Sequence, residues 1–332
     1  MKVMVAGGSG FVGSRLIPAL QEQGHEVGVY DLVVNPRFAS FTEQGDVRDT
    51  DHYSFACAGY DAIVNLAAAH RDDVRPIELY QQTNVDGATN TVRALIDNRI
   101  DRLVFTSTVA VYGLDKEASR ETDEPDPFNE YGRTKLAAEA IYRAWQADAQ
   151  QERNLFTVRP CVIFGEGNRG NVYTLAKQLS GGFFLTIGDG HNHKSMAYVG
   201  NVVAFLIGQL EHNTGSTLMN YADKPDLTTN ELVTVLRAAL NKHRGQSIHL
   251  PLGLGVIGGK AFDLMAKLLH RNLPISEVRI RKFAASTVVN TDKLEASGFQ
   301  RPFTIEEGLH RTVRAEFGVD FQASDGDEPT SS

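Results

Sequence analysis

The chain contains only two cysteines, Cys57 and Cys161, in 332 residues. Neither has a second cysteine near it in the sequence, which argues against a disulfide framework or a cysteine-rich zinc site. No uninterrupted apolar run reaches the ~18 residues that a transmembrane helix needs. Residues 1–6 already have a strand pattern, which leaves no room for a signal peptide before them. The scarcity of cysteine and the lack of a membrane span or signal peptide in this sequence predict a cytoplasmic protein in a reducing compartment.

The chain also lacks an excess of positive charge, because 33 Lys and Arg residues face 41 Asp and Glu residues. A net charge of −8 without a long basic run offers no binding surface for nucleic acid. The most apolar stretch, residues 248–269, is interrupted by Lys260, Asp263 and Lys267. It predicts a turn followed by an amphipathic helix, with contact to a membrane surface as the lesser alternative. The polar, acidic residues 322–332 predict a disordered tail.

Short apolar runs alternate with helical periodicity through the first half of the chain. Strands are expected at residues 1–6, 26–30, 62–66, 103–106 and 155–159, and helices at 11–23, 50–57, 76–98 and 129–149. This alternation predicts an α/β protein with a Rossmann-type, doubly wound parallel sheet covered by helices on both faces.

Beyond Cys161 the pattern weakens into glycine-rich loops and isolated helices at residues 230–241 and 305–317. We therefore expect a Rossmann domain over residues 1–160, completed by segments near 195–225. A smaller, mixed and discontinuous substrate-binding lobe is expected within residues 161–320.

The first expected strand leads into the glycine turn Gly7-Gly8-Ser9-Gly10-Phe11-Val12-Gly13, which opens the first helix. Such a turn lets the backbone approach a pyrophosphate, whose charge then meets free N–H groups at the helix N-terminus. Asp31 ends the second strand, where a carboxylate can accept hydrogen bonds from an adenosine ribose. Because that carboxylate would repel a 2′-phosphate, NAD is favoured over NADP. Arg37 lies near enough in sequence to keep NADP as the alternative.

Tyr131 and Lys135 stand one turn apart on one face of an expected helix. A cation beside a phenol favours the phenolate, so the pair predicts a general base. Residues 137, 140, 141 and 144 lie on the opposite side of this helix and are expected to pack as its apolar stripe.

These motifs, taken together, resemble the extended short-chain dehydrogenase/reductase family, within its nucleotide-sugar epimerases, dehydratases and reductases. The resemblance runs almost end to end and adds the segments around Asp46-Val47, Asn65-Leu66-Ala67-Ala68, Asn84 and Thr106 to Gly113. It implies a cofactor-binding set of Gly7, Ser9, Gly10, Phe11, Val12, Gly13, Asp31, Asp46, Val47, Leu66, Ala67, Ala68, Asn84, Thr106, Tyr131, Lys135 and Pro160, with NAD as the cofactor.

The resemblance also implies catalytic roles for Thr108, Tyr131 and Lys135. Tyr131 would take a proton from a sugar hydroxyl, Lys135 would stabilise the phenolate, and Thr108 would hydrogen-bond the developing ketone. Its substrate-binding candidates are His70, Thr108, Asn171, Lys194 and Arg279, although His70 also fits an ordinary loop histidine. No metal is expected, because Asp189, His191 and His193 share one glycine-rich loop with no distant ligand.

Three reactions share this machinery. Dehydratases of the family usually follow the catalytic Thr with Asp-Glu, whereas Thr108 is followed by Val109-Ala110, which argues against dehydration. Val162 stands where epimerases usually carry an Asn, which weakens the analogy with galactose epimerases.

We expect an NAD-dependent epimerase of the UDP-sugar 4-epimerase type, working through a transient ketosugar. A nucleotide-4-ketosugar reductase is the alternative, and a non-catalytic NAD-sensing regulator a lesser one. The resemblance further implies a nucleotide-sugar substrate, a role in polysaccharide biosynthesis, and a homodimer formed through the helices at residues 76–98 and 129–149.

Overall fold

The computed structural model describes residues 1–71, 74–113, 116, 118–242, 246–251, 253 and 286–318. A seven-stranded sheet runs in the order β10-β6-β5-β4-β1-β2-β3, and every neighbouring pair of strands is parallel. Its strands are β1 (Lys2–Ala6), β2 (Glu26–Asp31), β3 (Thr42–Gln44), β4 (Ala62–Asn65), β5 (Arg102–Thr106), β6 (Asn154–Pro160) and β10 (Ser216–Tyr221). The strand order reverses between β1 and β4, which is where sheets of this kind bind ligands.

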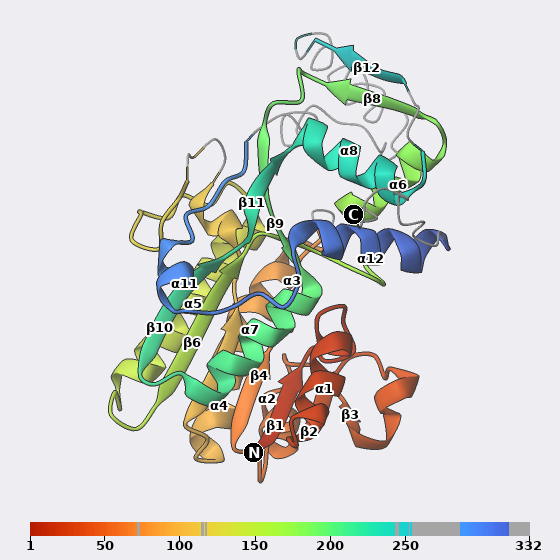
Figure 1. Ribbon diagram of the computed structural model, residues 1–332. Coiled ribbons are helices and arrows are strands. Elements are labelled where there is room, and N and C mark those ends of the chain that lie inside the picture. Colours follow the sequence, from red (N-terminus) through yellow and green to blue (C-terminus); the bar gives the residue numbers. More distant parts are fainter. Residues whose placement is uncertain are drawn as a thin grey trace, which may run out of the picture.

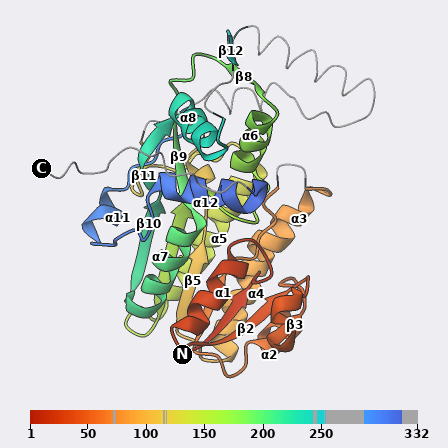
Figure 2. The same ribbon diagram turned by 45° about the vertical axis from the view of Figure 1, so that its right-hand side comes forward.

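Side chains alternate across the sheet, so each face has its own core. Val3 and Val5 of β1 pack on the side of α1 (Gly13–Glu22) and α7 (Val199–His212). Met4 and Ala6 pack on the side of α2 (Thr50–Ala56), α4 (Gly87–Asp97) and α5 (Glu130–Ala147). Figures 1 and 2 show the resulting three layers. The predicted Rossmann-type architecture is confirmed.

A smaller lobe lies at the carboxyl ends of these strands (Figure 1). It contains a three-stranded sheet in the order β11 (Asp223–Thr228), β9 (His193–Tyr198) and β7 (Val162–Phe164), and a parallel pair of β8 (Phe183–Ile187) with β12 (Gln246–Leu250). Helices α6 (Asn171–Ser180), α8 (Thr229–Ala239) and α12 (Ile305–Phe317) complete it, whereas α11 (Asp292–Ala296) packs against β10. Only Cys161 separates β6 from β7, so the lobe begins where the parallel sheet ends.

The helix expected at residues 76–98 is confirmed, as a continuous run of α3 (Glu78–Tyr80), a π-helical segment (Gln81–Asp86) and α4. Two other local expectations were wrong. Parts of the expected glycine-rich loops form β8 and β9, whose strand partners are distant in sequence. Residues 248–250 belong to β12 instead of a turn. Most of the remaining stretch to residue 269, together with Arg279 and the tail at 322–332, lies outside the described residues.

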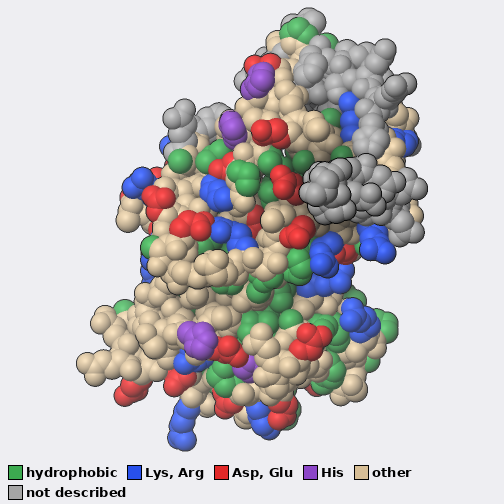
Figure 3. Space-filling view, viewed as in Figure 1, with side chains coloured by type: hydrophobic (Ala, Val, Ile, Leu, Met, Phe, Trp, Pro, Cys, Tyr) green, Lys and Arg blue, Asp and Glu red, His purple; other side chains and the backbone are tan. Residues whose placement is uncertain are grey.

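The face of the molecule in Figure 3 carries basic and acidic side chains interspersed over its described part. Among the described helices, none has both the length and the apolar character needed to cross a bilayer. Cys57 and Cys161 are both buried and both free.

Candidate active site

The glycine turn packs tightly between β1 and β4. Gly7 has a φ of +77°, and a Cβ placed on it would lie 2.6 Å from the backbone nitrogen of Ala67. A Cβ on Gly13 would lie 2.4 Å from the carbonyl oxygen of Gly8. Only glycine fits at these two positions, because the nearby backbone atoms cannot move aside and, at Gly7, L side chains rarely adopt such a φ. Within the described structure, the N–H groups of Phe11 and Val12 have no acceptor, so they remain available to an anion at the start of α1.

Asp31 ties the end of β2 to this turn. Its Oδ2 accepts a hydrogen bond from Ser9 N at 3.0 Å, and its Oδ1 accepts one from Val33 N at 3.0 Å. The carboxylate keeps free lone pairs beside the turn, as the predicted contact with a ribose requires. The Arg37 guanidinium instead lies 5.5 Å above the Phe38 ring.

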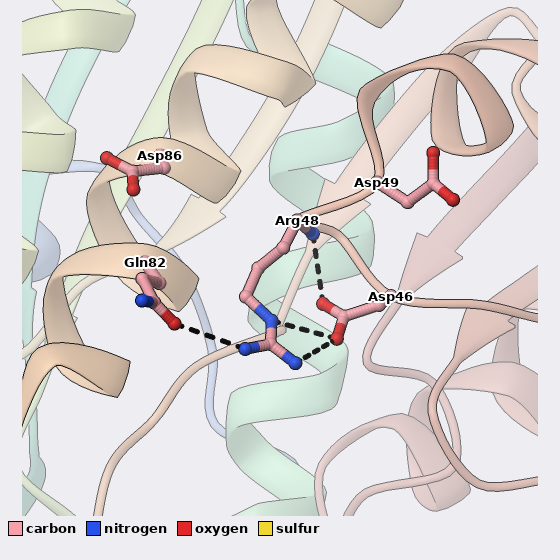
Figure 4. A pocket seen from close by; sticks show the side chains of 5 residues that line it. All are labelled: Asp46, Arg48, Asp49, Gln82 and Asp86. Atoms are coloured by element: carbon pink, nitrogen blue, oxygen red, sulfur yellow. Dashed lines mark hydrogen bonds and ion pairs between the residues drawn. The ribbon is translucent and has the colours of Figure 1, made fainter. Parts of the chain in front are cut away.

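A hollow of about 390 Å³ opens beyond β3, between the loop that carries Asp46 and the π-helical segment (Figure 4). Arg48 spans it, since Nε and Nη2 both donate to Asp46 Oδ2, at 2.8 and 2.5 Å, and Nη1 donates to Gln82 Oε1 at 3.2 Å. The Arg48 hydrogen bonds lower the pKa of the Asp46 carboxyl. Val47 is buried, and its carbonyl accepts from Asn90 Nδ2 at 2.9 Å. The segment with Asp46 and Val47, which the resemblance assigns to the cofactor site, is therefore held at the rim of this hollow.

Thr108 and Tyr131 meet, as the motif spacing predicts. Thr108 begins a 3-10 turn (Val109–Tyr112) after β5, and its Oγ1 accepts from Ala110 N at 3.2 Å. A hydrogen bond from the Thr108 side chain reaches the Tyr131 phenol and favours the phenolate. Asn129 caps α5 through Gly132 N at 2.8 Å, which fixes the first turn that carries Tyr131.

Burial shifts the pKa values of both Tyr131 and Lys135. Burial raises the pKa of Tyr131 to about 12, and Thr108 only partly opposes this rise. Burial also lowers the pKa of Lys135 to about 7. The Lys135 ammonium lies 4.2 Å from the centroid of the Phe105 ring. Burial therefore disfavours the charged form of both groups, and the role of Lys135 in favouring the phenolate remains a prediction.

Two polar atoms near this pair lack hydrogen-bond partners within the described structure, and that pattern fits a bound dinucleotide. Thr106 Oγ1 is buried with no hydrogen-bond partner within the described structure. Lys135 Nζ, on a side chain only 2% exposed, likewise makes no hydrogen bond to a described residue. Hydroxyl and amide groups of NAD would supply what these atoms lack. The expected wall residues Leu66, Ala68 and Pro160 follow or end β4 and β6 at the same edge of the sheet.

Asn84 makes structural hydrogen bonds, and its predicted contact with the cofactor remains a prediction. Its amide exchanges hydrogen bonds with Ala69 N and O at 2.8 and 3.0 Å, and Nδ2 also donates to Thr134 Oγ1 at 2.9 Å. These bonds join the loop after β4 to α5, so Asn84 positions the cofactor-lining segment.

The substrate candidates are spread along the chain. His70 is exposed, and its Nδ1 lies 3.4 Å from the carbonyl of Ala68. Asn171 is the first residue of α6, and Lys194 lies in β9. Burial lowers the pKa of Lys194 to about 8. These positions remain predictions.

No group of three potential metal ligands occurs in the part of the chain that the structure describes. Asp189 Oδ1 accepts from the backbone of His191 at 3.0 Å, and His193 Nδ1 lies 3.3 Å from the carbonyl of Asp226. The loop is therefore closed by local hydrogen bonds.

Reasoning from the sequence alone missed a buried polar cluster behind Lys135. Glu139 is 1% exposed and accepts from Arg159 Nε at 2.9 Å and Nη2 at 2.6 Å, and from Ser107 Oγ at 2.5 Å. Arg159 Nη1 also donates to Tyr112 Oη at 2.8 Å. The signal was present in the sequence, because Glu139 follows Lys135 by one turn on the helix face that carries the lysine.

A family profile described as "NAD dependent epimerase/dehydratase family" matches residues 3–221. The chain belongs to this family. Over 316 residues it is 45% identical to the N-acetyl-alpha-D-glucosaminyl-diphospho-ditrans,octacis-undecaprenol 4-epimerase of Escherichia coli O157:H7, with 95% of each chain covered. It is 26% identical to the UDP-glucose 4-epimerase of Vibrio cholerae, with 94% of each chain covered.

Among solved structures, MoeE5 in complex with UDP-glucose and NAD superposes with a TM-score of 0.75 at 23% identity. That match covers 95% of this chain and 98% of MoeE5, and it supports the fold. The protein is an enzyme that uses NAD, and the predicted family and epimerase activity are confirmed.

Proposed function

We propose that the protein is a 4-epimerase whose substrate is N-acetylglucosamine held on a diphosphate, with a polyprenol as the carrier. The observation that carries this proposal is 45% identity, over 95% of both chains, to an enzyme named for that substrate and reaction. Thr108, Tyr131 and Lys135 supply the polar groups that such a reaction needs.

Bound NAD supplies a reversible acceptor for the hydrogen on C4 of the sugar. Tyr131 takes the proton from the 4-hydroxyl as that carbon is oxidised, and returns it after the ketosugar has turned its other face. Thr108 hydrogen-bonds the same oxygen and favours the phenolate. The Lys135 ammonium lies one turn from Tyr131 and stabilises the negative charge when the phenol ionises.

The polyprenyl carrier also has support in the sequence. Residues 248–269 are the most apolar stretch of the chain, and Lys260, Asp263 and Lys267 recur in it at helical intervals. A segment of this composition suits a membrane surface or a lipid chain. A nucleotide carrier is the second candidate, favoured by the Vibrio cholerae relative and by the UDP-glucose bound to MoeE5.

Parallel assays with the two carriers test the proposal. Purified protein is incubated with N-acetylglucosaminyl-diphospho-undecaprenol in detergent and, separately, with UDP-N-acetylglucosamine and UDP-glucose, and the released sugar is identified. Conversion of the lipid-linked sugar to the N-acetylgalactosamine epimer supports the proposal. Turnover of UDP-sugars alone would show that the carrier is a nucleotide instead of a polyprenol. Absence of epimerisation with either carrier would refute the proposed 4-epimerase activity.

The proposal includes a homodimer. Ala140 and Ala144 of α5 are exposed instead of packing as the expected stripe, and Ile96 of α4, the helix packed against α5, is 51% exposed. A second copy would cover this face. Sedimentation of the wild type and of Ile96→Asp tests it, with dimer and monomer as the expected species.

We also propose a cytoplasmic location and a role in supplying sugars for polysaccharide assembly, which the two relatives' sugar substrates support. Fractionation of cells, followed by detection of the protein, tests the location.

A further inference from the structure

Lys135 is a basic residue whose ammonium group is buried against an aromatic ring. Its side chain is 2% exposed, its ammonium faces the Phe105 ring, and no described residue forms an ion pair with it. A buried lysine tends to lose its proton, which would remove the charge that stabilises a Tyr131 phenolate. Some neighbouring group must therefore favour the charged form.

Glu139 is the acidic group placed to do so. It lies one turn beyond Lys135 on the buried face of α5, and its carboxylate is the charge that raises the pKa of Lys135 against the effect of burial. Its two oxygens are fixed by the paired hydrogen bonds of Arg159 and by Ser107. These hydrogen bonds fix the position of the carboxylate one helical turn from the lysine.

The other titratable groups on elements packed against α5 are less suited to this role. They are Glu78 and Tyr80 of α3, Asp86 of the π-helical segment, Arg93 and Asp97 of α4, Tyr112 of the 3-10 turn and Arg159 of β6. Glu78, Asp86, Arg93 and Asp97 are exposed, so water screens them. Tyr80 donates to the carbonyl of Arg71, and Tyr112 and Arg159 belong to the Glu139 cluster.

Arg159 belongs to a longer chain of hydrogen bonds. Tyr112 Oη, which accepts from Arg159, donates to Asn220 Oδ1 of β10 at 2.7 Å. Asn220 Nδ2 then donates to the carbonyl of Ser119 at 3.0 Å. The guanidinium is thereby anchored to the sheet through Tyr112 and Asn220.

We propose that Glu139 is a positioning residue that keeps the Lys135 ammonium charged inside the apolar site, while Arg159 and Ser107 hold its carboxylate in place. The inference rests on the role proposed above for Lys135, but it concerns the protonation of that lysine and can be tested without substrate. A buried ion pair with only a structural role would leave the lysine unaffected.

The test is a titration of Lys135 by NMR. Protein carrying ¹³C at the lysine ε position is titrated without ligands, and the Lys135 resonance is assigned with Lys135→Met. Glu139→Gln alone would leave the Arg159 cation buried without a partner and endanger folding. The informative variant is therefore Glu139→Gln/Arg159→Met, which removes both charges, and Ser107→Ala is the matched control that keeps them.

We expect the titration midpoint of Lys135 to fall by about one pH unit in the double variant and to move by less than about 0.3 unit in Ser107→Ala. The alkaline limb of the kcat/KM profile should fall by the same amount. An unchanged midpoint in a folded double variant, or an equal shift in Ser107→Ala, would overturn the proposal. If the enzyme failed to epimerise sugars, the titration would still show whether Glu139 keeps Lys135 charged.

Discussion

The Lys135 ammonium lies 4.2 Å from the centre of the Phe105 ring, on a side chain that is 2% exposed. An aromatic face attracts a cation, but it replaces only part of the hydration lost on burial. The lowered pKa of Lys135, about 7, reflects the remainder. Burying the Lys135 ammonium therefore lowers the stability of the fold, although the proposed reaction needs this charge. The cost should appear in the free energy of unfolding.

Lys135→Met should stabilise the protein at neutral pH. The pKa of Lys135 is about 7 in the folded chain against 10.5 in the unfolded one. Between these values the unfolded chain binds the extra proton, so wild-type stability should rise with pH across this window. The variant should be more stable by on the order of 3 kcal/mol at pH 7, and the gap should close toward pH 10.

Urea unfolding from pH 6 to pH 10 measures this gap, with the exposed Lys177→Met as the control. If wild type and Lys135→Met had equal free energies of unfolding at every pH, burial of the ammonium would not lower the stability of the fold.

Tyr131→Phe removes the group that moves the proton and keeps the ring. Turnover should fall by at least ~100-fold, the scale of losing a general base, while NAD binding stays unchanged. Initial rates and calorimetric NAD titration give the two quantities. Tyr173→Phe, whose ring stacks on Phe317 away from Thr108, serves as the control. Near-normal turnover in Tyr131→Phe would remove it from catalysis.

Three alanine variants separate the roles of glycine. Gly7→Ala places a Cβ 2.6 Å from Ala67 N at a φ of +77°, so the fold of the turn should be lost along with NAD binding. Gly24→Ala has a φ of +82° with nothing within 4 Å, and should cost only about 1 kcal/mol. Gly10→Ala meets only the Gly7 carbonyl, at 3.2 Å, and should fold but bind NAD weakly.

Thermal unfolding and NAD titration of these variants distinguish the outcomes. Normal NAD affinity in Gly7→Ala would mean that the close approach to Ala67 does not constrain the turn.

Asp31→Asn should relax the preference for NAD. The amide oxygen can still accept from Ser9 N, which preserves the turn, but the charge that repels a 2′-phosphate is gone. The ratio of NADP to NAD dissociation constants should fall by about tenfold or more. Fluorescence titration with both cofactors measures it, and an unchanged ratio would show that another group excludes the phosphate.

The features that depend on local order were predictable from the sequence. The apolar runs of β1 and β4, the glycine turn and the spacing of Tyr131 and Lys135 were visible in short segments. The pairing of β8 with β12, which are distant in sequence, was missed, and so was β3, which has only three residues, all of them polar. Local propensity contains no information on such pairings.

The candidate site was predictable in the same partial way. The meeting of Thr108 with Tyr131 follows from motif position, whereas the direction of the pKa shifts depends on burial, which only the fold supplies. The Glu139–Arg159 pair joins a helix to a strand, so its partner choice could not be read from either segment alone.

The proposed reaction oxidises and then reduces C4 within one site, while Tyr131 moves the proton. It is tested most directly with N-acetylglucosaminyl-diphospho-undecaprenol deuterated at C4, analysed by mass spectrometry and NMR after incubation with the NAD-bound protein. We expect an epimer inverted at C4 that retains the deuterium, with no net accumulation of NADH. Inversion with loss of the deuterium to solvent, or recovery of substrate with C4 unchanged, would contradict this mechanism.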